Sequence, residues 1–479
     1  MRNEPLRRAG PILAFLLAGC AIGPDYKRPD TAAPSAYRGE TAGSKQSLAD
    51  LAWWDVYRDP RLVELIRLSL SDGFDVREAA ARVAESRAIA AQVHGQLFPS
   101  IGYNAEADRG RNSVLGNPFP SQAGSPASDG FAGYLSAAWE FDLWGRVRRL
   151  DEAARAQYLE SEEGRRAVLL SLVSDVATAY YELLELDEEL AIAHEATDSF
   201  GKSLSLFNRQ LEGGTVSRLE TATAEAAMDT SAARIPDLER LIAIKENQIS
   251  VLVGKFPGPV ARGARLSEEP AAPDIPSGLP SDLLERRPDV REAEYAARAA
   301  NAGIGVTVGG FLPRIGLSAI LGGVSTQLSS ITSHKAALWS VGADASGPLF
   351  QGGGLRGQYE QAKQEWEVAK LQYQQAALNA FDDVANALVT RQKLAEVRTE
   401  EERAVLAYQE AVELSTKRYS AGKASYYEVI QSQLQLFPAQ VALAQTKRDQ
   451  FTAVVQLYKA LGGGWNLKDA DWTGAASNR

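Results

Sequence analysis

The chain of 479 residues repeats one pattern of segments at a spacing of roughly 210 residues. The pentapeptide Asp-Val-Arg-Glu-Ala at 75–79 recurs unchanged at 289–293. Further identities follow in the same order and at nearly the same offset, among them Asp175 and Asp383, Gly214 and Gly422, and Gly254 and Gly462. A solenoid repeat is far shorter than this period. We therefore predict two copies of one structural unit, a first repeat at 51–260 and a second at 281–465, with a linker at 261–280 and a C-terminal tail at 466–479.

Each copy contains one very long segment with helical periodicity and no proline. The first spans 146–211 and the second about 355–419. Apolar residues in the first recur in alternating steps of three and four, as in the seam of a coiled coil. At 1.5 Å per residue, each helix would be about 100 Å long. Each ends at a glycine-containing break, where glycine permits a left-handed C-cap.

Shorter helical segments accompany each long one. A helix at about 60–95 opens the first copy, and one at 281–309 opens the second. A return helix follows each glycine break, to about residue 253 and residue 461. Pro236 and Pro438 fall inside these return helices and predict kinks or breaks, because proline lacks the N–H that the helix ladder needs.

Between the opening helix and the long helix, each copy has two segments with strand-like alternation. They predict strands at about 100–112 and 130–143, and at about 313–321 and 338–350. Small and aromatic residues on one face and polar residues on the other are typical of membrane β-barrels. Four strands cannot close a barrel around a channel, and open sheet edges cannot face lipid. If these strands cross a membrane, the chain must oligomerise; the alternative is a pair of hairpins in a soluble domain.

The N-terminus has the pattern of a bacterial lipoprotein signal. Arg2, Arg7 and Arg8 precede a short apolar segment at 12–18, and Leu-Ala-Gly then leads into Cys20. We predict a signal peptide at 1–19, acylation of the Cys20 thiol, and a lipidated tether at 20–50 that is rich in Pro, Gly, Ser and Thr. An ordinary secretory signal with an accidental cysteine is the alternative.

Composition excludes several other classes of function. A net charge of −10 argues against a nucleic-acid partner, because phosphate binding needs a basic surface. The single cysteine excludes disulfide frameworks and multi-cysteine metal sites. His94, His194 and His334 lack the spacing that puts two ligands on one helix face. Phosphate-loop, His-Glu-x-x-His and Gly-x-Ser-x-Gly motifs do not occur, so we predict no catalytic residues, no cofactor and no metal.

Several motifs along the whole chain resemble those of one family. They are Gly-Pro-Asp-Tyr-Lys-Arg-Pro at 23–29, Trp-Trp at 53–54, Leu-Phe-Pro-Ser-Ile at 97–101, Phe-Asp-Leu-Trp-Gly-Arg at 141–146, Leu-Glu-Arg-Arg-Pro-Asp-Val at 284–290, Pro-Leu-Phe-Gln-Gly-Gly at 348–353 and Ala-Leu-Gly-Gly-Gly-Trp at 460–465. With the lipoprotein signal and the duplication, they resemble the TolC-type outer-membrane factors, specifically the OprM/NodT-like lipoprotein branch. The residue after the cysteine is Ala21. In lipoproteins of this sort an aspartate there favours retention in the inner membrane, so the resemblance implies the outer membrane.

The resemblance implies a mainly α-helical fold with a membrane β-barrel portion. Three chains with four strands each would form a 12-stranded barrel, which long helices continue as a periplasmic α-helical barrel. The implied function is the outer-membrane channel of a tripartite efflux system. It is a passive, gated duct that an inner-membrane pump, usually of the resistance–nodulation–division type, feeds through a periplasmic adaptor, the membrane fusion protein. Outer-membrane lipids are the remaining implied partner.

The resemblance also assigns roles to residues at the ends of the long helices. The adaptor would contact two tips, Gly213, Gly214, Thr215, Val216 and Ser217 in the first copy and Gly422, Lys423, Ala424 and Ser425 in the second. The family's acidic gate pattern Asp-Val-Leu-Asp matches residues 428–431, where Glu428 keeps a carboxylate and Gln431 does not. We predict a gate with one ring of three Glu428 carboxylates. If Glu428 is only a solvated helix residue, Tyr426 and Tyr427 are the next candidates, as bulky steric stops.

Two further functions remain open. One is an outer-membrane duct for an ABC-type or heavy-metal exporter, since substrate choice resides mostly in the pump. The other is a non-channel structural lipoprotein whose coiled coils span the periplasm. The structural-lipoprotein alternative does not explain why each copy has a pair of strands at the same place.

Overall fold

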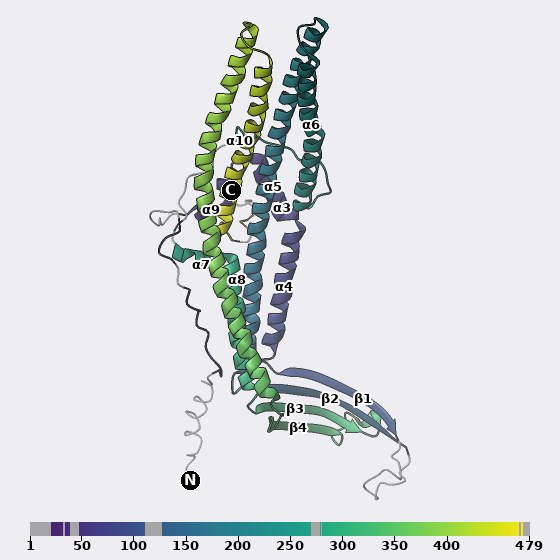
Figure 1. Ribbon diagram of the computed structural model, residues 1–479. Coiled ribbons are helices and arrows are strands. Elements are labelled where there is room, and N and C mark those ends of the chain that lie inside the picture. Colours follow the sequence, from purple (N-terminus) through teal and green to yellow (C-terminus); the bar gives the residue numbers. More distant parts are fainter. Residues whose placement is uncertain are drawn as a thin grey trace. The chain divides into compact units, whose positions relative to one another are not determined.

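The computed structural model of the protein describes residues 21–31, 34–38, 47–110, 127–269, 278, 280–468 and 471–472. Cys20, the predicted signal peptide and residues 111–126, which include the end of the first predicted strand, lie outside these residues. The elements are, in chain order, η1 Leu48–Asp50, α2 Trp53–Val56, α3 Pro60–Asp72, α4 Phe74–Gly95, β1 Ser100–Gly110, β2 Ser128–Phe141, α5 Arg146–Glu212, α6 Arg218–Leu252, η3 Pro280–Asp282, α7 Leu283–Arg286, α8 Pro288–Gly309, β3 Arg314–Ser325, η4 Leu328–Ser330, β4 Ala337–Ser346, α9 Gly354–Ser420 and α10 Tyr427–Ala460 (Figure 1). Both halves of the chain thus have the same order of main elements.

The polypeptide forms two compact units, and each draws segments from both halves of the sequence. The first unit contains Val83–Ser161, Ala293–Tyr373 and the N-terminal residues up to Pro29. The second contains Asp30–Arg82, Glu162–Glu292 and Gln374–Arg479. Helices α4, α5, α8 and α9 pass from one unit into the other, since the boundaries fall inside them.

The first unit contains one antiparallel sheet with strand order β1-β2-β3-β4. Residues directly opposite one another share a face. One such row is Tyr103, Leu135, Leu321 and Trp339, and all four side chains are more than half exposed. A neighbouring row on the same face is Ile101, Ala137, Ala319 and Val341. The other face carries small and polar residues, for example Gly102, Ser136 and Ser340 with Ile320 between them.

The strands differ from the predicted ones at their ends. β3 continues to Ser325, beyond the predicted limit at residue 321, because Gly322 and Gly323 remain paired with β2 and β4. β4 ends at Ser346, earlier than the predicted limit at residue 350. Glycine is common in loops, which led the sequence interpretation to end β3 too early.

The second unit contains two helical hairpins, α5 with α6 and α9 with α10 (Figure 1). The predicted breaks at Pro236 and Pro438 do not occur, since α6 and α10 each continue through their proline. Leu436 and Phe437 directly before Pro438 are buried, so packing on that turn offsets the lost backbone hydrogen bond. The α5 stretch that is apolar enough to cross a membrane is 67% buried inside the protein, as in a core helix.

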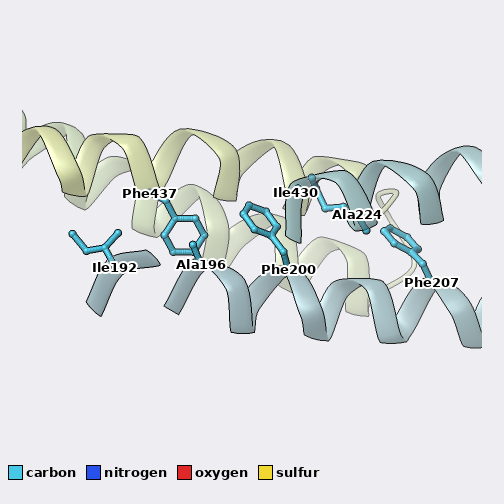
Figure 2. Close-up of a cluster of buried hydrophobic side chains, with 8 residues drawn as sticks. Ile192, Ala196, Phe200, Phe207, Ala224, Ile430 and Phe437 are labelled. Atoms are coloured by element: carbon cyan, nitrogen blue, oxygen red, sulfur yellow. The ribbon is translucent and has the colours of Figure 1, made fainter. Parts of the chain in front are cut away.

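Aromatic and aliphatic side chains join the two hairpins near their ends. We call this group the hairpin core; its buried members are Ile192, Ala196, Phe200, Phe207, Ala224, Ala227, Ile430 and Phe437. Figure 2 shows the Phe200 and Phe437 rings next to one another between α5 and α10. Their centroids are 5.6 Å apart, and the two rings meet edge-on. Rings in this geometry contribute roughly 0.5–1.5 kcal/mol beyond the area they bury.

Candidate functional site

The two hairpin tips are built by the same backbone motif. Gly214 (φ +71°) and Gly422 (φ +66°) adopt the left-handed conformation, which costs a residue with a Cβ more than it costs glycine. After them, the Thr215 amide donates to the Gln210 carbonyl and the Lys423 amide donates to the Arg418 carbonyl, both at 2.9 Å. These are the hydrogen bonds of a Schellman C-cap. The predicted tip residues therefore form the turns of the two hairpins, and all of them are exposed or half-exposed.

The two tips differ in how the next helix begins. In the first, Ser217 and Glu220 form a capping box at the start of α6, and the Ser217 amide donates to the Glu220 carboxylate at 3.0 Å. Hydrogen bonds from Ser217 lower the pKa of that carboxyl group. In the second, α10 has Tyr426 as its N-cap residue and no side-chain cap.

Glu428, which corresponds to Glu220, makes an ion pair instead of a cap. Its Oε2 atom lies 3.4 Å from Nε of Arg418 on α9, and both side chains are about half exposed. Arg418, Tyr427, Glu428 and Gln431 line one shallow groove beside the end of α9. The structure thus brings Glu428 together with Tyr427 and Gln431, and adds a cation that the sequence interpretation did not include.

Tyr426 lies apart from that groove, in contact with the hairpin core. Its ring centroid is 5.0 Å from that of Phe207 and 4.7 Å from that of Tyr419, both edge-on. Its hydroxyl group lies 2.9 Å from Oγ of Ser203 on α5. Tyr426 therefore attaches the start of α10 to α5.

The residues that hold Tyr426 were missed in the sequence interpretation. Ser203, Phe207 and Gln210 recur at helical spacing on α5, and Gln210 donates to the Tyr419 hydroxyl. Their periodicity indicates one face of a helix. The periodicity does not indicate which residues of another helix this face of α5 contacts.

The described residues offer no group of three or more His, Cys, Asp or Glu side chains that could hold a metal ion. His94 instead contacts a carboxylate, with its Nδ1 atom 3.0 Å from Oδ1 of Asp151.

Known proteins resemble this chain along most of its length. The family model described as outer membrane efflux protein matches residues 65–255 and 279–463, which coincide closely with the two copies of the repeat. The solvent efflux pump outer membrane protein SrpC of Pseudomonas putida is 34% identical over 470 residues, which are 95% of this chain and 98% of that protein. The probable outer membrane lipoprotein SilC of Salmonella typhimurium is 28% identical over 455 residues, which are 94% of this chain and 97% of that protein. The solved structure of the outer-membrane channel OprN has a TM-score of 0.86 at 30% identity, and covers 93% of this chain and 100% of its own.

Proposed function

The chain belongs to the family of outer membrane efflux proteins, and on that premise we propose that it forms the gated, passive exit duct of a tripartite efflux system. The predicted TolC-type fold and outer-membrane location are confirmed. Its relatives are channel or transport components rather than enzymes. The proposed partners are an inner-membrane pump, of the resistance–nodulation–division type, and a periplasmic adaptor.

The observation that carries the proposal is the four-stranded sheet, which has one apolar face and, among the described residues, no strand paired to the outer edge of β1 or β4. Lipid tails cannot hydrogen-bond the backbone groups along β1 and β4, so strands from other copies must cover these edges. Four strands are too few to enclose a channel, whereas the 12 strands of three copies would enclose one. We therefore infer a homotrimer.

Light scattering of the purified chain in detergent tests this stoichiometry. After correction for the micelle, the protein mass is expected to be three times the 51.6 kDa of one chain, less the signal peptide. The trimer should also form ion-conducting pores in planar bilayers. A monomer or dimer as the sole species, or a trimer without conductance, contradicts the proposal.

We infer that the two hairpin tips receive the adaptor. Their backbone turns around small residues, which permit close approach of another helical hairpin. Both tips carry the same Schellman cap, so they present similar backbone surfaces to a repeated partner. The tip residues of this proposal are those predicted from the sequence.

We infer that Glu428 contributes a ring of three carboxylates to the gate. The groove it shares with Tyr427 is open to solvent, which keeps both side chains available to a pore. The ion pair with Arg418 fixes the carboxylate against α9 and offsets part of its charge. Tyr427, half exposed in the same groove, is the better steric stop of the two tyrosines, because Tyr426 is bound to Ser203 and Phe207.

Glu428→Gln is expected to reduce the cation-over-anion permeability of the trimer by at least about twofold, because a ring of three negative charges is lost. Reversal potentials in a salt gradient measure this ratio. Glu220→Gln is the matched control: it is the corresponding residue of the first copy, and glutamine also serves in a capping box. Equal reversal potentials in Glu428→Gln and the control would leave Glu428 as a solvated helix residue.

We infer that Cys20 carries the lipid anchor. The support is the Leu-Ala-Gly-Cys sequence around the only cysteine, together with a relative that is named an outer membrane lipoprotein. Two anchors then hold each chain in the membrane, the acyl chains and the strands.

A further inference from the structure

The residues that follow Cys20 occupy a fitted site on the first unit. This segment, residues 21–29, contacts α5, α8 and the loop before α5. The Ile22 amide donates to the Trp144 carbonyl at 3.0 Å, and Nδ2 of Asn301 donates to the Pro24 carbonyl at 2.9 Å. Further along, Arg28 pairs with Glu294 of α8. The sequence interpretation treated this region as a tether, and these contacts make residues 21–29 a docked strap.

A buried arginine provides the centre of the site. The Arg149 side chain is only 4% exposed, and its Nε and Nη2 atoms donate to the Ile22 and Gly23 carbonyls at 3.1 and 3.3 Å. Nη2 also lies 2.8 Å from Oδ1 of Asp25. Without the strap, this guanidinium would keep the Glu152 carboxylate at 2.8 Å and would lose its contacts to Asp25 and to the two backbone carbonyls. A buried cation needs such acceptors, so the arginine favours the docked state.

Two glycines let the strap backbone lie directly on α8. Gly23 has a φ of +104°, and a Cβ added to it would lie 2.5 Å from the Gly305 Cα. A Cβ on Gly305 would lie 2.6 Å from the Ile22 carbonyl oxygen and 2.7 Å from Cγ of Arg149. Neither separation is possible without displacement of the backbone. The contact is therefore fitted in shape as well as in charge.

The strap begins where the sheet meets the helices. Trp144 lies in the connection between β2 and α5, and its Nε1 atom donates at 2.8 Å to the carbonyl of Pro313, the residue before β3. Only Ala21 separates Ile22 from Cys20 in the sequence, and two residues of extended chain span at most about 7 Å. Tryptophan in this position is typical of a membrane–water interface.

We propose that the strap is a docking element that fixes the acylated Cys20 near the β2–α5 and α8–β3 junctions. The distance between the lipid anchor and the membrane-facing sheet is then constant. The inference rests on the acylation proposed above. It assigns to Arg149, Gly23 and Gly305 the recognition of the chain's own N-terminal segment. Docking also places the bond between Lys27 and Arg28 in the bound segment, where a protease reaches it only after the strap opens.

Limited trypsin digestion of the purified full-length protein in detergent tests this assignment. Cleavage after Lys27 releases the peptide 20–27, and its rate of appearance in mass spectra measures strap opening. Arg149→Gln is expected to release this peptide at least about tenfold faster than the wild type, because three donor contacts to the strap are lost. Glu152→Gln removes the other partner of Arg149 and leaves the strap contacts in place, so its rate should stay within about twofold of the wild type.

A glycine pair on α8 gives a second, independent comparison. Gly305→Ala should favour the helix locally but displace the strap, and should release the peptide at least about tenfold faster. Gly303→Ala, two residues away, meets nothing within 4 Å of its added Cβ and should leave the rate unchanged. Equal rates of peptide release for the two alanine variants, or for Arg149→Gln and the wild type, would refute the proposed docking of the strap.

The same spectra separate this inference from the acylation on which it rests. Slow release of a peptide that carries lipid supports both. Slow release of an unmodified peptide 20–27 refutes acylation at Cys20, and with it the placement of the anchor, but leaves the docking of the strap intact. Fast release of a lipidated peptide from every variant and from the wild type retains the acylation and refutes the docking.

Discussion

Phe207→Ala is expected to lower the local stability of the hairpin core by about 3–5 kcal/mol, the usual cost of removing a buried phenylalanine ring. Phe207 is 2% exposed, and its ring contacts Tyr426 at the start of α10. Loss of the ring leaves Tyr426 with a cavity on one side, so the connection between α5 and α10 weakens beside the proposed gate. We therefore expect a lower thermal midpoint together with more frequent channel opening in planar bilayers.

Phe256→Ala is the matched control for this variant. The Phe256 side chain is 95% exposed, so the same substitution there should change stability by no more than about 0.5 kcal/mol. Thermal unfolding of the detergent-solubilised trimer and single-channel recordings supply both readouts. If the Phe207→Ala channel opens no more often than the Phe256→Ala channel while its thermal midpoint falls, the hairpin core stabilises the fold but does not control the gate.

The periodic parts of this chain could be predicted closely from its sequence. The long helices were expected at 146–211 and about 355–419, and α5 and α9 end within about one residue of those limits. Helical periodicity persists over many turns, so each turn adds to the same signal. The glycine breaks were equally informative, because Gly214 and Gly422 adopt a conformation that other residues rarely take.

The site depends on contacts that periodicity does not specify. Glu220 and Glu428 occupy corresponding positions in the two copies, yet one caps a helix and the other pairs with Arg418. Tyr426 and Tyr427 were both proposed as bulky steric stops, but Tyr426 contacts α5 while Tyr427 faces the groove. The strap has no periodicity at all, and its fit to Arg149 follows only from the folded first unit.

A second large effect is expected from pH, through a pair of carboxyl groups in the second unit. Asp59 is 3% exposed, accepts a hydrogen bond from the Arg61 amide at 2.7 Å, and also accepts one from the Tyr180 hydroxyl. The Tyr180 hydroxyl in turn accepts one from the Gly263 amide at 2.9 Å. Burial, and then the hydrogen bond and charge of Asp59, raise the pKa of Glu269 to about 8. Burial keeps the pKa of Tyr180 well above its ordinary value, so this phenol stays neutral.

The sign of the effect follows from the raised pKa of Glu269. Between its ordinary value of 4.5 and about 8, the folded chain binds this proton and the unfolded chain does not. The stabilisation is therefore complete below about pH 4.5 and is lost as the pH rises through about 8. Because Glu269 is only half-buried, solvent screening reduces the expected loss to about 1–3 kcal/mol between pH 5 and pH 9. Above pH 8, the two carboxylates repel one another and weaken the attachment of residues 258–269 to α3 and α5.

Glu269→Gln removes the titrating group and keeps a neutral side chain of the same size. Its thermal midpoint should vary less with pH than that of the wild type, and should exceed the wild-type midpoint at pH 9. Glu268→Gln, the exposed neighbour, should follow the wild-type profile. The measurement is the midpoint of thermal unfolding at a series of pH values from 5 to 9, at constant ionic strength. If the midpoint of Glu269→Gln depends on pH as strongly as that of the wild type, another group titrates. Glu185 is the next candidate, because burial and the neighbouring Glu189 raise its pKa to about 7.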